Sequence, residues 1–120
     1  MDFTKFKAAA NAYTATAAFV SSNKDTVQKF VSAEVECLNY VKTHKPEAVA
    51  SIRKWSGTDD QALAEYAYDF FQPLWRSDPT VDPTLIANAV REAAKKADKP
   101  APSDLSTFVD NSFVDQATKG

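Results

Sequence analysis

The chain has 120 residues, 44% of them hydrophobic and 25% charged, and a formal net charge of −2 at pH 7. This length suits one hydrophobic core, so residues 1–120 are expected to fold as a single domain. Lysines and acids are interleaved along the chain, which disfavours a nucleic-acid partner because such a partner needs clustered basic residues. No stretch reaches the roughly 20 apolar residues that cross a bilayer, so membrane insertion is not expected either.

The sequence also lacks the residue patterns of common catalytic and metal sites. Cys37 is the only cysteine, so neither an intrachain disulfide nor a thiolate metal cluster can form. His44, the only histidine, lies seven residues further on, about 10 Å away along one helix and too far for a direct hydrogen bond. With two glycines, the chain has no phosphate-binding loop. We expect a protein that is not an enzyme and has no metal site and no cofactor.

The first twenty residues fit either a helix or a strand. Their alanines favour a helix, whereas the segment around Tyr13 and Thr14 fits a strand equally well. We expect a short strand there, followed by a turn of helix capped at Thr16.

Two longer helices are predicted next. The first runs from about Lys24 to His44 with Asn23 as its N-cap, and its apolar positions are Val27, Phe30, Val31, Leu38 and Val41. The second opens at Pro46 and ends at Gly57 in the left-handed conformation, with an apolar face of Ala48, Val49, Ile52 and Trp55. Phe30 and Trp55 are expected in the core, where truncation to alanine would cost about 3–5 kcal/mol.

Helix signals continue to the C-terminus. Thr58 and Gln61 fit a capping box for a helix that ends or kinks at Pro73 and carries Leu63, Tyr66, Ala67, Phe70 and Phe71 on its apolar face. Asp82 and Pro83 start a helix through about Ala97 with a buried face of Ile86, Ala89, Val90, Ala93 and Ala97.

After a linker at 98–102, Ser103 and Asp110 are candidate caps for last turns that pack back through Leu105, Phe108, Val109, Phe113 and Val114. The expected class is mainly α, with five to six short-to-medium helices in hairpin packing and at most one short strand near the N-terminus.

The most site-like stretch is FFQPLWRSDPTVDP at residues 70–83. Trp75 offers a stacking surface beside the permanent cation of Arg76, a pair that could bind a carboxylate or a sulfonate. A tryptophan that follows a helix end can equally plug the core, with the neighbouring arginine solvated. Both readings stay open from the sequence.

Several motifs in this order resemble the C-terminal part of periplasmic solute-binding proteins of ABC importers, of the nitrate, sulfonate, taurine and thiamine-precursor type. The resemblance covers about residues 12–115. Its motifs are Tyr13-Thr14, Thr16 to Phe19, Asp25-Thr26-Val27, His44-Lys45-Pro46-Glu47-Ala48, Gly57-Thr58-Asp59, Phe71, Trp75, Val81-Asp82-Pro83 and the ending from Asp104 to Val114. Lys24 departs from the proline usual at that position.

This resemblance implies that the chain is the helical part of a type II periplasmic-binding α/β fold, a non-catalytic segment of a solute-binding protein. It places Tyr13 and Thr14 near a ligand cleft, with a small anionic or polar solute as the implied partner. Because most of both sheets is missing, ligand binding by the isolated segment is doubtful. The alternative is a small helical scaffold or interaction module whose apolar helix faces are covered by a copy of itself or by another partner. The family is periplasmic or extracytoplasmic, but the chain as given has no signal peptide and would remain cytoplasmic.

Overall fold

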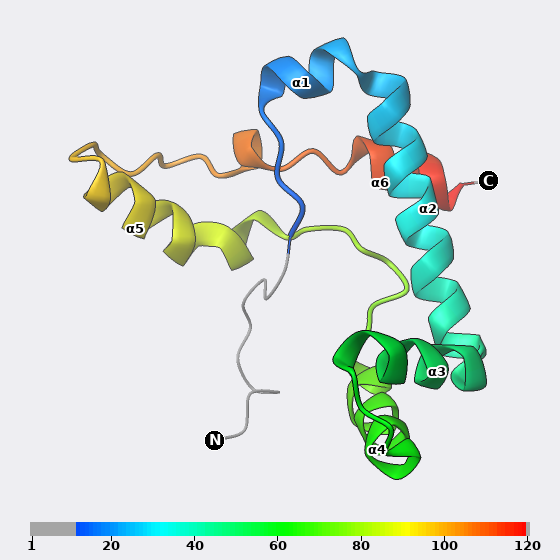
Figure 1. Ribbon diagram of the computed structural model, residues 1–120. Helices are drawn as coiled ribbons and strands as arrows, with labels where there is room; N and C mark the ends of the chain where they lie inside the picture. Colours follow the sequence, from blue (N-terminus) through cyan, green and yellow to red (C-terminus); the bar gives the residue numbers. More distant parts are fainter. Residues whose placement is uncertain (1–11, 120) are drawn as a thin grey trace.

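The computed structural model describes residues 12–119 and is mainly helical (Figure 1). Its elements, in which η denotes a 3-10 helix, are α1 (Ala17–Ser22), α2 (Lys24–Thr43), α3 (Lys45–Ser56), α4 (Gln61–Phe71), η2 (Gln72–Leu74), η3 (Pro83–Ile86), α5 (Ala87–Lys96), η4 (Ser106–Phe108) and α6 (Ser112–Thr118). The expected α class is confirmed. The expected strand at Tyr13 and Thr14 is wrong, because residues 12–16 are neither strand nor helix and the described residues offer them no pairing strand.

Most helix boundaries follow the local signals of the sequence. The Thr16 hydroxyl accepts a hydrogen bond from the Phe19 amide at 3.2 Å and starts α1 as predicted. Pro46 lies in the first turn of α3, and Gly57 ends that helix with φ of 69°. The Asp82 carboxylate accepts from the Thr84 amide at 2.9 Å at the start of η3.

Three caps differ from the prediction. The N-cap of α4 is Asp60, whose carboxylate accepts from the Leu63 amide at 3.0 Å, whereas the Thr58 hydroxyl accepts from the Asp60 amide in the preceding loop. A carboxylate suits the positive end of a helix better than a hydroxyl does, which favours Asp60 over Thr58. Asn23 does occupy the start of α2, but its side chain donates to the Phe19 carbonyl and so closes α1 instead. The N-cap of η4 is Leu105 rather than Ser103 as predicted, and the Asp104 carboxylate accepts from the Ser106 amide at 2.9 Å.

The main core joins α3 and α4 to the end of α2. Ala48, Val49, Ala64 and Tyr68 are buried, and the half-buried Val41, Ile52 and Trp75 pack against them. The Tyr68 hydroxyl lies 2.8 Å from the Val41 carbonyl and 3.2 Å from the Lys42 carbonyl, two of the acceptors that a helix end leaves without partners. Lys45 in α3 forms an ion pair with Asp69 in α4 at 2.6 Å. We call α3, α4 and this cluster the hairpin core.

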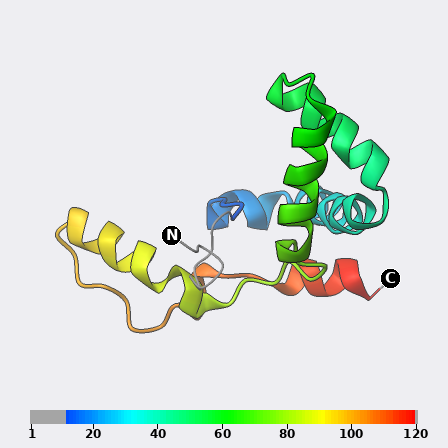
Figure 2. The same ribbon diagram turned by 90° about the horizontal axis from the view of Figure 1, so that it is seen from below.

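A second contact places the C-terminal helix against the middle of the chain. Helix α6 crosses α2 at a steep angle and packs against it (Figures 1 and 2), and Val35 and Val114 are buried. The Gln28 side-chain amide donates to the Phe113 carbonyl at 3.0 Å across this contact. Successive helices therefore pack as a hairpin in α3 and α4. Helix α6, in contrast, packs against α2, which is distant from it in sequence.

The molecule is extended rather than compact. Its radius of gyration is 17.3 Å, compared with about 14 Å for a compact chain of this length. Figures 1 and 2 show α5 projecting to the side opposite α3 and α4, with the following segment running back beside it. Among the described residues, none in η3, α5 or η4 is buried.

This open arrangement overturns several burial predictions. Trp55 is 80% exposed and Phe30 45% exposed, so neither is a core residue. Of the face expected from Ile86 to Ala97, only Ile86 in η3 and Val90 in α5 are half-buried, and Ala89, Ala93 and Ala97 are exposed. In the last turns Val114 is buried as predicted, whereas Phe108 is 56% exposed. These predictions assumed that every apolar helix face finds a partner within the chain.

Candidate functional site

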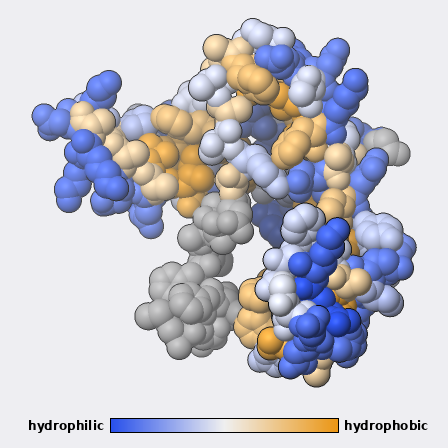
Figure 3. Space-filling view, viewed as in Figure 1, coloured by the Kyte–Doolittle hydropathy of each residue, from blue (hydrophilic) through white to orange (hydrophobic). Residues whose placement is uncertain are grey.

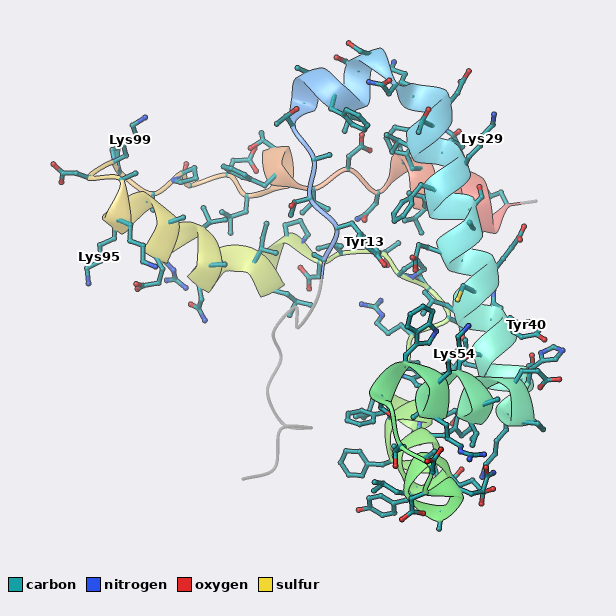
Figure 4. All side chains as sticks on the ribbon, in the orientation of Figure 1. Tyr13, Lys29, Tyr40, Lys54, Lys95 and Lys99 are labelled. Atoms are coloured by element: carbon teal, nitrogen blue, oxygen red, sulfur yellow. The ribbon has the colours of Figure 1, made fainter. Side chains whose placement is uncertain are left out.

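Tyr13 and Thr14 lie on the extended segment that approaches α2. Tyr13 is labelled in Figure 4. Its hydroxyl donates to the Glu34 carboxylate at 2.8 Å, and its ring meets Phe30 edge-on at 4.8 Å between centroids. This hydrogen bond, together with the charge of Glu34, raises the pKa of the Tyr13 phenol. Thr14 is exposed. Glu34 places a negative charge beside the predicted site, which opposes the approach of an anionic solute.

Trp75 packs into the hairpin core. Its ring meets Tyr68 edge-on at 5.4 Å between centroids, and its backbone amide donates to the Gln72 carbonyl at 3.2 Å. The residue is half-buried against the core cluster. This position matches the alternative in which the tryptophan plugs the core after a helix end.

Arg76 lies on the exposed loop that follows Trp75. Its guanidinium lies 3.5 Å from the Thr80 hydroxyl. Hydrogen bonds from Thr80 and Thr84 lower the pKa values of Asp78 and Asp82, and the positive charge of Arg76 contributes to both shifts. The cation therefore already has acidic neighbours in its own loop.

The four predicted residues lie on two separate segments, Tyr13 and Thr14 before α1 and Trp75 and Arg76 after η2. Within residues 12–119, no hydrogen bond or ring contact links Tyr13 or Thr14 with Trp75 or Arg76. A shallow hollow of about 390 Å³ lies elsewhere and is lined only by α2 side chains: Asp25, Gln28, Lys29, Ser32, Ala33 and Glu36. One face of one helix cannot enclose a small molecule in the way that ligand pockets do.

Other chemistry is also missing from the described part of the chain. No three histidine, cysteine or acidic side chains converge there to hold a metal ion. In the same residues no helix has both the length and the apolar character to cross a membrane.

In the described part of the chain, α4 and η2 expose an apolar face, of which the sequence pattern identified all but Leu74 as apolar helix positions. This face, called here the aromatic face, consists of Leu63 (55% exposed), Tyr66 (68%), Phe70 (52%), Phe71 (50%) and Leu74 (50%). Tyr66 stacks on Phe70 at 6.3 Å between centroids, and Phe70 meets Phe71 edge-on at 5.0 Å. Figure 3 shows hydrophobic surface along the edge of the lobe formed by α3 and α4.

The exposure of the aromatic face follows from the two-sided apolar character of α4. The side that packs against α3 presents Ala64, 1% exposed, and Tyr68, 4% exposed. Small Ala64 allows close approach of α3, and the Tyr68 hydroxyl finds acceptors at the end of α2. The larger apolar side chains therefore remain outside. In the sequence, this surface is indicated by apolar residues on more than one side of α4.

Asn111 is the second feature that sequence reasoning missed. Its side-chain amide donates to the Val81 carbonyl at 2.9 Å and accepts from the Val81 amide at 2.9 Å. Residues 82–110 carry η3, α5 and η4, and we call this segment the arm. The two hydrogen bonds between Val81 and Asn111 join the two ends of the arm, and we call this junction the neck. Because the two residues lie 30 positions apart, no local sequence pattern indicates the bond.

Comparison of the chain with family models, with curated proteins and with solved structures gives no match. The functional conclusion therefore depends on the geometry of the chain and on the motifs of its sequence.

Proposed function

We propose that the chain is a non-catalytic helical interaction module whose apolar helix faces are covered by another protein surface. The observation that carries this proposal is the aromatic face, five large side chains that are each at least half exposed. Soluble monomers rarely expose contiguous apolar patches of more than a few hundred Å², and larger ones mark interaction sites.

Two properties of the aromatic face support an interaction role. Aromatic side chains are enriched in protein interfaces, where they bury large areas at a small cost in conformational entropy. The ring contacts between Tyr66, Phe70 and Phe71 hold these side chains in place before a partner arrives. A preorganised face loses less entropy on binding.

An apolar dye whose fluorescence rises on hydrophobic surfaces tests this proposal. At low protein concentration, the folded chain is expected to bind the dye, and Tyr66→Ser with Phe70→Ser should reduce the signal strongly. The matched control is Trp55→Ser, an exposed aromatic residue outside the aromatic face. A folded chain that does not bind the dye would contradict the proposal.

The motif series from Tyr13 to Val114 favours a second candidate function. Under it the chain is the helical segment of a solute-binding protein of an ABC importer, and the covering surface belongs to that protein's own fold. The starts of α2 and α3 agree with this series, since Asp25 and Pro46 each lie in the first turn of a helix. In the parent family, the solute would be small and anionic or polar.

Calorimetric titration with nitrate, taurine, alkanesulfonates and pyrimidine precursors tests the second candidate. Because Glu34 accompanies Tyr13 and Trp75 packs on Tyr68, we expect flat heats from the isolated chain. Saturable binding that Arg76→Ala abolishes would show instead that the segment recognises a solute alone.

A further inference from the structure

We infer that the aromatic face of α4 binds a second copy of this chain, so that two α4 helices pack antiparallel about a two-fold axis. This inference rests on the proposed function and specifies the partner that covers the face. Three observations carry it: the area of the face, its symmetry about the Tyr66–Ala67 pair, and its lack of charge.

The exposed area suits a homodimer of standard size. The five side chains are 50 to 68% exposed, which corresponds to about 500 Å² of apolar surface if a whole aromatic side chain contributes about 200 Å² and leucine somewhat less. A standard interface buries about 800 Å² on each partner, and homodimer interfaces are about 65% apolar. The aromatic face therefore supplies about the apolar area that one copy must contribute.

The spacing along α4 is self-complementary. Leu63 and Phe70 lie at equal distances in sequence on either side of the Tyr66–Ala67 pair. In an antiparallel pair, Leu63 of one copy meets Phe70 of the other, and Tyr66 lies over Ala67. The small Ala67 side chain lets the two helix axes approach closely, as in other isologous interfaces.

Charge presents no obstacle to this pairing. The aromatic face contains no charged residue. The two carboxylates on α4 are bonded within the chain, Glu65 to the Gln61 amide and Asp69 to Lys45, both at 2.6 Å. An uncharged face is self-compatible, because two copies bring no like charges together at their contact.

Sedimentation velocity from about 1 μM to about 1 mM, a range that brackets ordinary homodimer affinities, tests the inference. The wild-type chain should pass from monomer to dimer within this range. Phe70→Lys should weaken the dimer at least about 30-fold, as loss of a central aromatic contact does. Phe108→Lys is the matched control, since Phe108 is 56% exposed and Phe70 52%, and it should leave the affinity unchanged. Circular dichroism verifies that both variants fold.

A cysteine cross-link tests the register independently. In a Cys37→Ser background, Ala67→Cys lies next to the expected two-fold axis and should give a disulfide-linked dimer under mild oxidation. Ala89→Cys, on the exposed side of α5, is the matched control and should remain mostly monomeric. Equal cross-linking of the two variants would overturn the proposed register.

The outcomes separate this inference from the proposed function. A chain that remains monomeric at the highest concentration but binds the apolar dye overturns the dimer and leaves the interaction module intact. A dimer that persists in Phe70→Lys places the interface elsewhere and also overturns the inference. A monomer that binds no dye contradicts both.

Discussion

The hairpin core and the arm are built from similar sequence patterns but reach very different degrees of packing. In the hairpin core, Val49, Ala64 and Tyr68 are at most 4% exposed, and Tyr68 reaches the last turn of α2. In the arm, residues 82–110, α5 has ten residues and none of the helical residues is buried. Isolated helices of that length are marginal in water. The stability of the arm therefore depends on the hydrogen bonds at its neck, whereas the stability of the hairpin core depends on buried side chains.

This difference shows where the chain can provide its own partner for an apolar face. α4 has two apolar sides, of which one meets α3 and the other remains as the aromatic face. α5 has one apolar side that is only half covered. Both regions present surfaces that a second protein surface would complete.

Replacing Tyr68 should produce the largest effect. Tyr68→Ala removes a buried ring and its hydrogen bond to Val41, so we expect a loss of about 3–5 kcal/mol in the free energy of unfolding, measured by urea denaturation. Tyr68→Phe removes only the hydroxyl and should cost about 1 kcal/mol. Trp55→Ala is the control: at 80% exposure it should change the stability by at most about 0.5 kcal/mol. Equal losses in Tyr68→Ala and Trp55→Ala would mean that the hairpin core is wrongly described.

Asn111→Ala should loosen the arm without affecting the hairpin core. The change leaves the amide and carbonyl of Val81 without their partners, at a cost of about 1–2 kcal/mol in a half-buried position. We expect faster hydrogen exchange at amides of α5 and unchanged exchange in α3 and α4. Asn39→Ala, an exposed position on α2, provides the control. Uniform acceleration across all helices would show that arm and hairpin core unfold as one unit.

Asp60→Ala should have a smaller effect, confined to the hairpin core. Loss of this N-cap is expected to lower the free energy of unfolding by about 1 kcal/mol. Thr58→Ala should cost less, because its hydroxyl bonds to the loop amide of Asp60 rather than to the helix. The reverse order in urea denaturation would restore Thr58 as the cap.

Acid should act on the arm through the hydrogen-bonded carboxylates of Asp82 and Asp104, with the smallest effect of the four. Hydrogen bonds from the Ser106 hydroxyl and amide lower the pKa of Asp104, and those from the Thr84 amide and hydroxyl lower that of Asp82. A lowered pKa in the folded state means that each bond stabilises the fold above the ordinary value of 3.8 and is lost as the pH falls through the folded value.

NMR titration of the side-chain carboxyl carbons measures these two pKa values. In the folded chain both midpoints should lie below those of the urea-unfolded chain. Identical midpoints in the two states would contradict the stabilising role of these hydrogen bonds.

The parts of the fold that were predictable are those that neighbouring residues determine. Gly57, Pro46 and the Asp82–Pro83 pair act within one turn of the chain, and each lies where the sequence placed it. The choice between the two apolar sides of α4 was not predictable, because it depends on how Ala64 and Tyr68 meet α3 and the end of α2. The hydrogen bonds between Asn111 and Val81 join residues that are 30 positions apart, so no local sequence pattern indicates them.

The candidate site shows the same limit. The sequence identified Trp75 as either a ligand contact or a core plug, and only its edge-on contact with Tyr68 supports one reading over the other. Tyr13 was selected by resemblance, whereas its bond to Glu34 on α2 depends on tertiary structure. The aromatic face was identified as apolar from the sequence, but its exposure could not be.

The concentration dependence of unfolding tests most directly whether the aromatic face is an interaction surface. Urea unfolding of the wild-type chain and of Phe70→Ser would be compared at low and at high protein concentration. We predict a wild-type midpoint that rises with concentration and a Phe70→Ser midpoint that does not, with stabilities within about 1 kcal/mol of each other at low concentration. A wild-type midpoint independent of concentration, together with a large loss of stability in Phe70→Ser at every concentration, would show that the aromatic face belongs to the core of the chain and contradict the account.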